Sequence, residues 1–357
     1  MAKTFRNLWP DLVSWPNLLQ AYRRCRRRKR YRPPATAFDF AWEVELLQLQ
    51  RELMSGEYIP GAYSHFRISD PKPRLISAAP FRDRVVHHAI VAVVEPIFER
   101  SFIDDSYACR RGRGTHLAIR RAQHYQRRFS WCLKTDIVQF FPSIDHEILI
   151  QVIGRRIADP CVMRLIRRIL DSDIDTTAVQ SEPVWFPGDD LLSPLRPRGL
   201  PIGNLTSQFF ANVLLNPIDH FIRETLRIPG YVRYADDLLL FSDGRDQLWE
   251  AVAAIRQQLA AMRLRLHPRK THVQPTSEWL TWLGMRIQGH RCRLSQQGIC
   301  RFIKRMRRQR KLFAGGRLDG DAIRKSLHAW LGHVDLVTEQ QVIGKLMAQH
   351  CVFRRLH

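Results

Sequence analysis

The chain has 357 residues and is 45% hydrophobic, so it can bury the core of a large globular protein. Its 57 Lys and Arg residues outnumber 34 Asp and Glu residues, and the formal net charge of +23 makes an extended polyanion the expected partner. The first residues do not have the pattern of a secretory signal and no apolar run approaches the length of a membrane-spanning helix, so we expect a cytoplasmic protein without a membrane partner.

Cysteine and histidine show no pattern of a metal centre. The seven cysteines are scattered and include no CxxC pair, which favours reduced thiols and argues against structural zinc. Four histidines (His87, His88, His116 and His124) have no Cys or carboxylate partner at ligand spacing. We expect these histidines to pack in the fold or to face phosphates.

Residues 1–62 are predicted to form a basic N-terminal extension. Positions 22–34 hold eight Lys or Arg residues and end in two prolines. Such a run is either a solvated face or a phosphate-binding surface, and the net charge of the chain favours the second. The residues predicted to bind nucleic acid here are Arg26, Arg27, Arg28 and Lys29. Residues 38–56 have apolar side chains at helical spacing, which predicts one amphipathic scaffold helix.

Strands and helices alternate through the next part of the chain. A turn at two prolines leads into a short strand within 66–77, and an apolar helix follows at 85–98. The segment 107–128 begins as a Gly-rich basic loop and continues as a basic helix. The loop residues predicted to bind nucleic acid are Arg111 and Arg113. A strand at 131–141 then ends in a turn before another helix.

The second half of the chain continues this alternation. Residues 171–199 are rich in Pro, Asp and Gly, which predicts a loop or hairpin. An apolar helix at 207–222 precedes two short strands at 231–244 that resemble a hairpin. A helix at 246–262 and a basic strand pair at 263–273 follow.

The C-terminal residues 291–357 are strongly basic and are predicted to be helical. The residues predicted to bind nucleic acid in this region are Lys304, Arg307 and Arg308. Because strands and helices alternate before this region, the chain as a whole is expected to be an α+β body with a basic helical C-terminal lobe.

The stretch VRYADDLLLF places Asp236 and Asp237 side by side between runs of strand-forming residues. Adjacent carboxylates repel each other and are costly near a strand interior, so a positive group must compensate for them. Asp136 follows another apolar strand, and it can converge with Asp236 if the two strands are neighbours. Such oxygen ligands suit Mg²⁺, and two ions would activate a 3′-hydroxyl and stabilise pyrophosphate. A turn-capping Asp or a surface ion pair is the alternative explanation.

YADD at 234–237 resembles the Y-x-D-D signature of reverse transcriptases, and six further blocks of that family follow the expected order. They are KPRLISAAPFRDRVVHHAI, YACRRGRGTHLAI, KTDIVQFFPSIDH, GLPIGNLTSQFFAN, LHPRKTHV and WLGM. The resemblance implies a right-hand polymerase of α+β class. Residues 63–290 would form its fingers and palm, and residues 291–357 a small helical thumb.

The resemblance also implies roles for individual residues. Asp136, Asp236 and Asp237 would be the catalytic carboxylates, and Asp136, Asp236 and the Ile137 carbonyl would hold two Mg²⁺ ions. The residues implied to bind the incoming dNTP are Lys72, Arg74, Phe141, Ile202, Gly203, Gln208 and Lys270. The residues implied to contact the primer are Trp282, Leu283 and Gly284.

Two of the nucleotide-binding roles have a simple physical basis. A planar guanidinium at Arg74 suits the oxygens of a triphosphate. The ring of Phe141 would clash with a ribose 2′-hydroxyl and so select dNTPs. Ordinary core packing is the alternative for Phe141, as for its neighbour Phe140.

The fourth block departs from the commoner pattern of the family. Many reverse transcriptases have Q-G-x-x-x-S-P there, whereas residues 202–208 read IGNLTSQ. This variant resembles the reverse transcriptases of diversity-generating retroelements, which copy a template-repeat RNA and misincorporate opposite template adenines. Ile202 lacks the polar group of Gln that could hydrogen-bond the nucleotide or template, so base-pair geometry would be restrained less specifically. A neutral hydrophobic substitution is the alternative.

The retroelement resemblance implies partners and a host. The partners would be the template-repeat RNA, its cDNA and a small basic accessory variability determinant protein, a helical pentamer, in a bacterial, phage or archaeal cytoplasm. The residues after 290 are expected to suffice for a thumb, without an RNase H or endonuclease domain. The alternatives are a group II intron-like, retron or phage-defence reverse transcriptase and, outside enzymes, an inactive RNA-binding scaffold, which the intact carboxylates disfavour.

Overall fold

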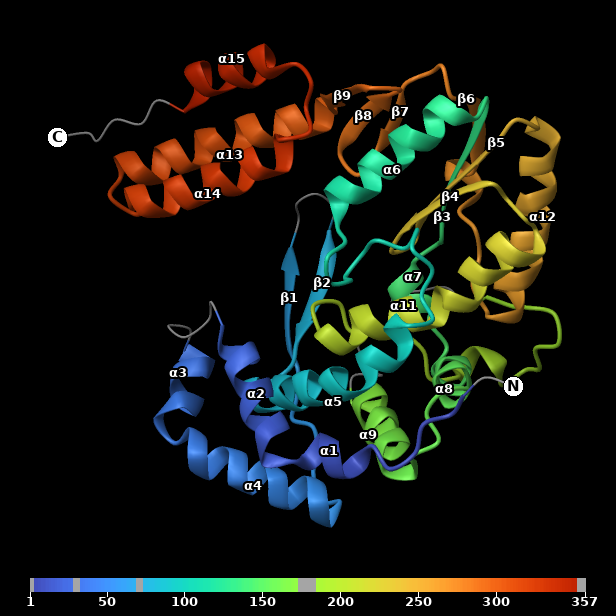
Figure 1. The fold of residues 1–357 in the computed structure, drawn as a ribbon. Helices are drawn as coiled ribbons and strands as arrows, with labels where there is room; N and C mark the ends of the chain where they lie inside the picture. The colour runs from blue at the N-terminus through green and yellow to red at the C-terminus, as the bar shows by residue number, and fades with distance from the viewer. Residues whose placement is uncertain (1–2, 28–32, 69–72, 173–183, 352–357) are drawn as a thin grey trace. The chain divides into compact units, whose positions relative to one another are not determined.

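The computed structural model describes residues 3–27, 33–68, 73–172 and 184–351. Helices and strands alternate along this part of the chain, and the strands form sheets of two, four and three strands (Figure 1). The predicted α+β class is confirmed. The chain divides into two compact units, each built from three segments. Unit 1 comprises residues 1–104, 136–227 and 251–270, and unit 2 comprises residues 105–135, 228–250 and 271–357.

Unit 1 begins with four helices: α1 (Trp9–Val13), α2 (Trp15–Arg26), α3 (Pro33–Phe40) and α4 (Trp42–Ser55). The single helix predicted over 38–56 is wrong, because Ala41 has a φ of −132° and a ψ of 36° and breaks the helical path between α3 and α4. Helices α1, α2 and α3 pack on the long helix α5 (Phe81–Glu99). The predicted helix at 85–98 is therefore confirmed.

The remainder of unit 1 contains a two-stranded sheet and further helices. Strand β1 (Ser64–Ile68) pairs antiparallel with β2 (Arg74–Ala78). The helices are α7 (Phe140–Ser143), α8 (His146–Gly154), α9 (Pro160–Asp171) and α11 (Leu205–His220), the last of which continues as a π-helical turn, Phe221–Thr225. The described part of the predicted loop, residues 184–199, contains turns and the 3-10 helix η1 (Ser193–Leu195).

Asp159 ties the N-terminal segment of unit 1 to helix α9. Its carboxylate caps the helix by accepting from Cys161 N (3.0 Å) and Val162 N (3.1 Å), and it also accepts from Leu8 N (2.7 Å) and Trp9 N (3.0 Å). Burial raises the pKa of the Asp159 carboxyl, but these backbone N–H groups more than offset that effect and lower the pKa. This buried carboxylate therefore fixes the start of α1 against the start of α9.

Unit 2 contains the four-stranded sheet, whose strand order is β4-β5-β3-β6. Its strands are β4 (Gly230–Tyr234), β5 (Asp237–Ser242), β3 (Trp131–Asp136) and β6 (His272–Pro275). Strands β4 and β5 form the predicted hairpin, and helix α6 (Thr115–Arg128) packs against both. Helix α12 (Arg245–Ala261) follows the hairpin, as predicted.

The basic strand pair predicted over 263–273 is wrong. Strand β6 pairs with β3, the preceding residues Pro268–Lys270 form the 3-10 turn η3, and an isolated bridge joins Leu266 to Ile137. Pro268 lacks a backbone N–H and cannot extend a ladder, so the segment turns instead of pairing with itself.

The C-terminal part of unit 2 combines a small sheet with helices. Strands β7 (Leu280–Trp282), β8 (Met285–Gln288) and β9 (Arg291–Leu294) precede helices α13 (Gln296–Ala314), α14 (Gly320–Val334) and α15 (Gln340–His350). Phe302 of α13 stacks on Trp330 of α14 with ring centroids 3.7 Å apart. The predicted helical character of this region is confirmed. No helix among the described residues is long and apolar enough to cross a membrane.

Candidate active site

The predicted carboxylates are divided between the two units. Asp136 is the last residue of β3 and belongs to unit 1, whereas Asp236 and Asp237 lie at the β4–β5 turn in unit 2. Strands β3 and β5 are neighbours in the sheet, which is the condition that the sequence argument set. Among the described residues, no three His, Cys, Asp or Glu side chains gather as a metal site. Binding of Mg²⁺ by these carboxylates stays a prediction.

The Asp136 carboxylate has a protein cation beside it. The His267 N–H donates to the Asp136 carbonyl (2.7 Å), which brings the η3 turn next to the end of β3. The Lys270 ammonium, at the end of that turn, forms an ion pair with Asp136 Oδ2. Because the Asp136 side chain is only 13% exposed, this ammonium supplies positive charge where solvent access is small. Ile137, whose carbonyl was a predicted metal ligand, has a buried side chain.

Within unit 1, the loop of the predicted nucleotide-binding residues Ile202 and Gly203 is joined to the strand that carries Arg74. The Ser77 N–H of β2 donates to the Ile202 carbonyl (3.0 Å), which joins the loop before α11 to the strand that Arg74 begins. Gly203 has a φ of 118°, and a Cβ there would lie 3.0 Å from Ile76 Cγ2. The loop approaches β2 this closely because residue 203 is glycine. Lys72 lies outside the described residues.

Phe141 and Gln208 are the other predicted nucleotide-binding residues of unit 1. Phe140 is buried in the core, whereas Phe141 is half-buried in the short helix α7. Gln208 is exposed on the first turn of α11. The difference in burial favours Phe141 over Phe140 as the ring that meets a nucleotide, and the gating role stays a prediction.

The YADD turn is held by two residues that the sequence argument missed. Ala235 has a φ of 56°, a left-handed conformation that costs a residue with a Cβ about 1–2 kcal/mol. The Arg233 side chain, which is fully buried, donates to the Ala235 carbonyl (3.2 Å). The Thr115 hydroxyl donates to the Tyr234 hydroxyl (3.1 Å). An arginine beside an acidic pair was a usable signal, but nothing in the sequence indicated the contact of Thr115 with a residue 119 positions away.

The predicted primer-contacting residues form the tight turn between β7 and β8. Leu283 and Gly284 have positive φ values of 48° and 81°, as two-residue hairpin loops require. Trp282 is 2% exposed, and its side chain packs in the core of unit 2. The predicted primer contact would therefore be made by Leu283, by Gly284 and by the backbone, and it stays a prediction.

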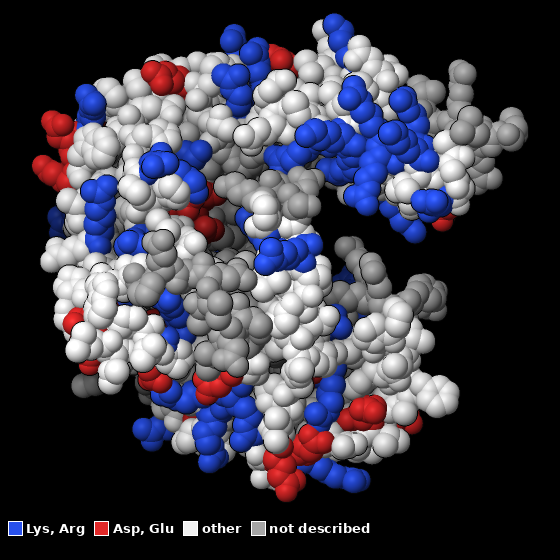
Figure 2. Space-filling model, turned by 180° about the vertical axis from the view of Figure 1, so that it is seen from behind, with Lys and Arg blue, Asp and Glu red and all other residues white. Residues whose placement is uncertain are grey.

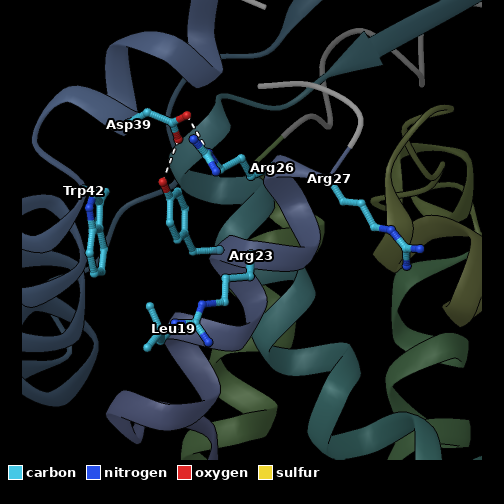
Figure 3. A pocket seen from close by; sticks show the side chains of 7 residues that line it. Leu19, Arg23, Arg26, Arg27, Asp39 and Trp42 are labelled. Carbon is cyan, nitrogen blue, oxygen red and sulfur yellow. Dashed lines mark hydrogen bonds and ion pairs between the residues drawn. The ribbon is translucent and has the colours of Figure 1, made fainter. Parts of the chain in front are cut away.

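A pocket of about 480 Å³ lies beside the basic N-terminal run (Figure 3). It is lined by Leu19, Tyr22, Arg23, Arg26, Arg27, Asp39 and Trp42. Asp39 accepts from Arg26 Nε (2.6 Å) and from the Tyr22 hydroxyl (2.7 Å). Burial, with the Asp39 carboxylate, raises the pKa of Tyr22 to about 12. Arg26 is thus engaged within the fold, whereas Arg27 is exposed for the predicted nucleic-acid contact. Arg28 and Lys29 lie outside the described residues.

The other predicted basic contacts lie in unit 2. Arg111 is exposed in the loop before α6, and the Arg113 guanidinium lies 5.8 Å from the centre of the Tyr107 ring. Lys304, Arg307 and Arg308 are all exposed on α13. Figure 2 shows Lys and Arg side chains gathered on the helical C-terminal region. This surface suits a polyanion, as the net charge suggested.

Comparisons with known proteins identify relatives of the chain. Residues 69–287 match the family described as reverse transcriptase (RNA-dependent DNA polymerase). Protein YkfC of Escherichia coli K12 is 26% identical over 302 residues, which cover 72% of this chain and 74% of that protein. The group II intron-encoded protein LtrA of Lactococcus lactis subsp. cremoris is 26% identical over 190 residues, which cover 52% of this chain and only 29% of LtrA.

A solved structure of telomerase from Candida tropicalis, truncated from its C-terminal domain, aligns with 66% of this chain and 55% of that chain, at 11% identity and a TM-score of 0.45. That likeness is too weak to bear on function. The family match is different in kind, because it spans more than half of the chain and contains each of the predicted carboxylates. The chain belongs to the reverse transcriptase family of RNA-dependent DNA polymerases.

Proposed function

We propose that this reverse transcriptase serves a diversity-generating retroelement, where it copies a template-repeat RNA into cDNA that is mutated at adenines. The observation that supports this role is the IGNLTSQ loop, whose Ile202 is bonded through its backbone to β2, the strand that begins with Arg74. Ile202 is a half-buried apolar residue, and its loop is joined to the strand that carries Arg74, a predicted triphosphate contact. The proposed partners are the template-repeat RNA, the cDNA and a basic accessory variability determinant pentamer.

In the proposed reaction the primer 3′-oxygen bonds to the α-phosphorus of a dNTP, and the bond from that phosphorus to pyrophosphate breaks. Asp136, Asp236 and the Ile137 carbonyl offer the hard oxygen ligands that Mg²⁺ prefers. When bound, two such ions would lower the barrier by activating the hydroxyl and stabilising pyrophosphate. The ammonium of Lys270 already marks a place beside Asp136 where positive charge is stabilised.

Asp236→Ala tests the catalytic assignment. The substitution removes one oxygen ligand from the proposed metal site, so Mg²⁺-dependent dNTP incorporation should be abolished. RNA affinity should stay nearly unchanged, since the basic residues are intact. Primer extension with labelled dNTP and RNA binding by fluorescence anisotropy measure the two quantities. Asp246→Ala, which removes an exposed carboxylate at the start of α12, is the matched control and should synthesise normally. Unchanged synthesis by the Asp236 variant would sink the assignment.

The error spectrum of the cDNA tests the retroelement role. Errors of the wild-type enzyme should concentrate opposite template adenines, and Ile202→Gln should reduce them because an amide can hydrogen-bond the nascent pair. Ile202→Leu keeps the site apolar and should retain the adenine errors. Deep sequencing of cDNA made on one RNA template by each form measures the rates. An even spectrum from the wild type contradicts the retroelement role, and identical spectra from wild type and the Gln variant contradict the role of Ile202.

A group II intron-like reverse transcriptase is the second candidate. The similarity to the group II intron-encoded protein LtrA favours it. Such an enzyme has no need of adenine-directed errors, so the same sequencing experiment separates the two candidates. A spectrum without adenine preference would favour the intron-like role.

A further inference from the structure

We infer that Thr115 is a positioning residue for the catalytic turn. Its Oγ1 donates a hydrogen bond to the Tyr234 Oη at 3.1 Å. Tyr234 stands opposite Asp237 in the β4–β5 ladder, and Ala235 and Asp236 form the two-residue loop between them. A contact that fixes Tyr234 therefore also restrains the start of the loop that carries Asp236. The inference rests on the proposed role of Asp236 in DNA synthesis.

Tyr234 is held at its backbone, at its ring and at its hydroxyl. Its backbone is fixed, because the preceding residue Arg233 donates its N–H to the Asp105 carbonyl (2.8 Å) and accepts from the Tyr107 N–H (3.0 Å). Its ring packs on the core of unit 2 and is only partly buried. The contact with Thr115 fixes the far end of the ring, so backbone, ring and hydroxyl are all restrained.

Thr115 can act as a fixed point because the start of α6 is itself anchored. Ala118, Ile119 and Ala122 bury one face of α6 completely in the core of unit 2. The next residue, His116, places its Nε2 3.3 Å from the His333 carbonyl oxygen of α14. The first two residues of α6 thus link the catalytic hairpin to the helical C-terminal region.

The residues around His333 extend this link to the predicted primer turn. The His333 Nε2 lies 3.8 Å from the position that a Cβ on Gly284 would take. Burial lowers the pKa of His333, and the neighbouring His116 lowers it further. Within unit 2, the start of α6 therefore contacts both Tyr234 and α14, and His333 of α14 lies near the β7–β8 turn.

Loss of the Thr115 hydroxyl should act on the chemical step more than on nucleotide binding. The residues predicted to hold the triphosphate, Arg74 among them, belong to the other unit and keep their contacts. Asp236 would be less well placed for the transition state, so kcat should fall about 3- to 10-fold, the range that one neutral hydrogen bond supports. The KM for dNTP should change less than twofold.

The experiment measures steady-state primer extension by the full chain for Thr115→Val, Tyr234→Phe and the double variant. Each single variant breaks the same hydrogen bond, so the double variant should lose no more than the more impaired single variant. Thr115→Ser keeps the hydroxyl and should restore most of kcat. Thr338→Val is the matched control, because it removes a threonine hydroxyl that donates to the Cys292 carbonyl (3.0 Å) elsewhere in unit 2. It should lower stability without changing kcat.

Three results would overturn the inference. They are a Thr115→Val enzyme with wild-type kcat, additive losses in the double variant, and an equal loss of kcat in the Thr338 control. In each of these cases the wild type still makes DNA, so the proposed function stands. A wild-type chain that makes no DNA would instead overturn the proposed function, and this inference with it.

Discussion

Positive charge reaches the candidate site in two different ways at the scale of single residues. Lys270 meets the Asp136 carboxylate directly, whereas Arg233 turns its guanidinium to the backbone carbonyl of Ala235. The first arrangement offsets charge at a carboxylate that solvent hardly reaches, and the second stabilises an unfavourable backbone conformation. A lysine thus balances charge at one place, whereas an arginine stabilises backbone geometry at the other.

His87 makes the stability of unit 1 depend on pH. It is 2% exposed on α5, and burial lowers its pKa to about 3. In the unfolded chain a histidine titrates near pH 6.5, so below that pH the unfolded state binds a proton that the folded state refuses. The stability from neutral His87 is complete above about pH 6.5 and is lost as pH falls towards 3, by at most about 1.4 kcal/mol per pH unit.

Denaturant unfolding of wild type and His87→Leu at pH 7 and pH 5 tests this dependence. The Leu variant cannot gain a proton on unfolding, so it should lose clearly less stability between the two pH values. His124→Gln, which removes an exposed histidine of α6, should follow the wild type. Parallel pH dependence in wild type and the Leu variant would rule out His87 as the source.

At the scale of elements, the loop that carries Ile202 depends on how closely it packs on β2. Gly203→Ala introduces a Cβ 3.0 Å from Ile76 Cγ2 at a φ of 118°. The strained backbone alone should cost about 1–3 kcal/mol, and the clash should also push the loop from β2 and raise the KM for dNTP. Thermal unfolding and primer extension measure the two effects.

Gly56→Ala is the control for the stability lost through backbone strain alone. Gly56 ends α4 with a φ of 80°, and a Cβ there would meet nothing within 4 Å. This variant should lose stability through its backbone conformation but keep the wild-type KM. If both variants behave alike in KM, the close packing of the loop on β2 is not important for nucleotide binding.

Elements were more predictable from the sequence than their contacts were. The hairpin around YADD followed from alternating apolar runs, and α5, α6 and α12 followed from helical periodicity. The break at Ala41 was not predicted, because neither Gly nor Pro stands at that position in the sequence. The Lys270 to Asp136 and Thr115 to Tyr234 contacts join residues 134 and 119 positions apart. Such pairings depend on how the elements pack, which local periodicity does not record.

At the scale of the whole molecule, the net charge of +23 should make RNA binding steeply dependent on salt. Each phosphate contact on a single strand adds about 0.7 to the slope of log K against log salt. Replacing Lys304, Arg307 and Arg308 by Gln should therefore reduce the slope by about 2. Anisotropy titrations with a labelled single-stranded RNA at several salt concentrations give the slope.

The matched control replaces three exposed arginines of unit 1, Arg51, Arg155 and Arg164, by Gln. It lowers the net charge equally but touches no predicted contact. Its slope should stay within error of the wild type. Equal changes in both triple variants would mean that α13 binds RNA no more directly than the rest of the surface.

The interleaving of the two units has a consequence for synthesis of the chain. The chain passes between them at residues 104–105, 135–136, 227–228, 250–251 and 270–271. Neither unit is a continuous fragment, so neither can be completed early on the ribosome and left to fold while the other is made. Unit 1 lacks its last segment until Lys270 has been added, and this residue is also the one that neutralises Asp136. Asp136, a predicted metal ligand, can therefore gain its ion pair with Lys270 only after this last segment of unit 1 has been made.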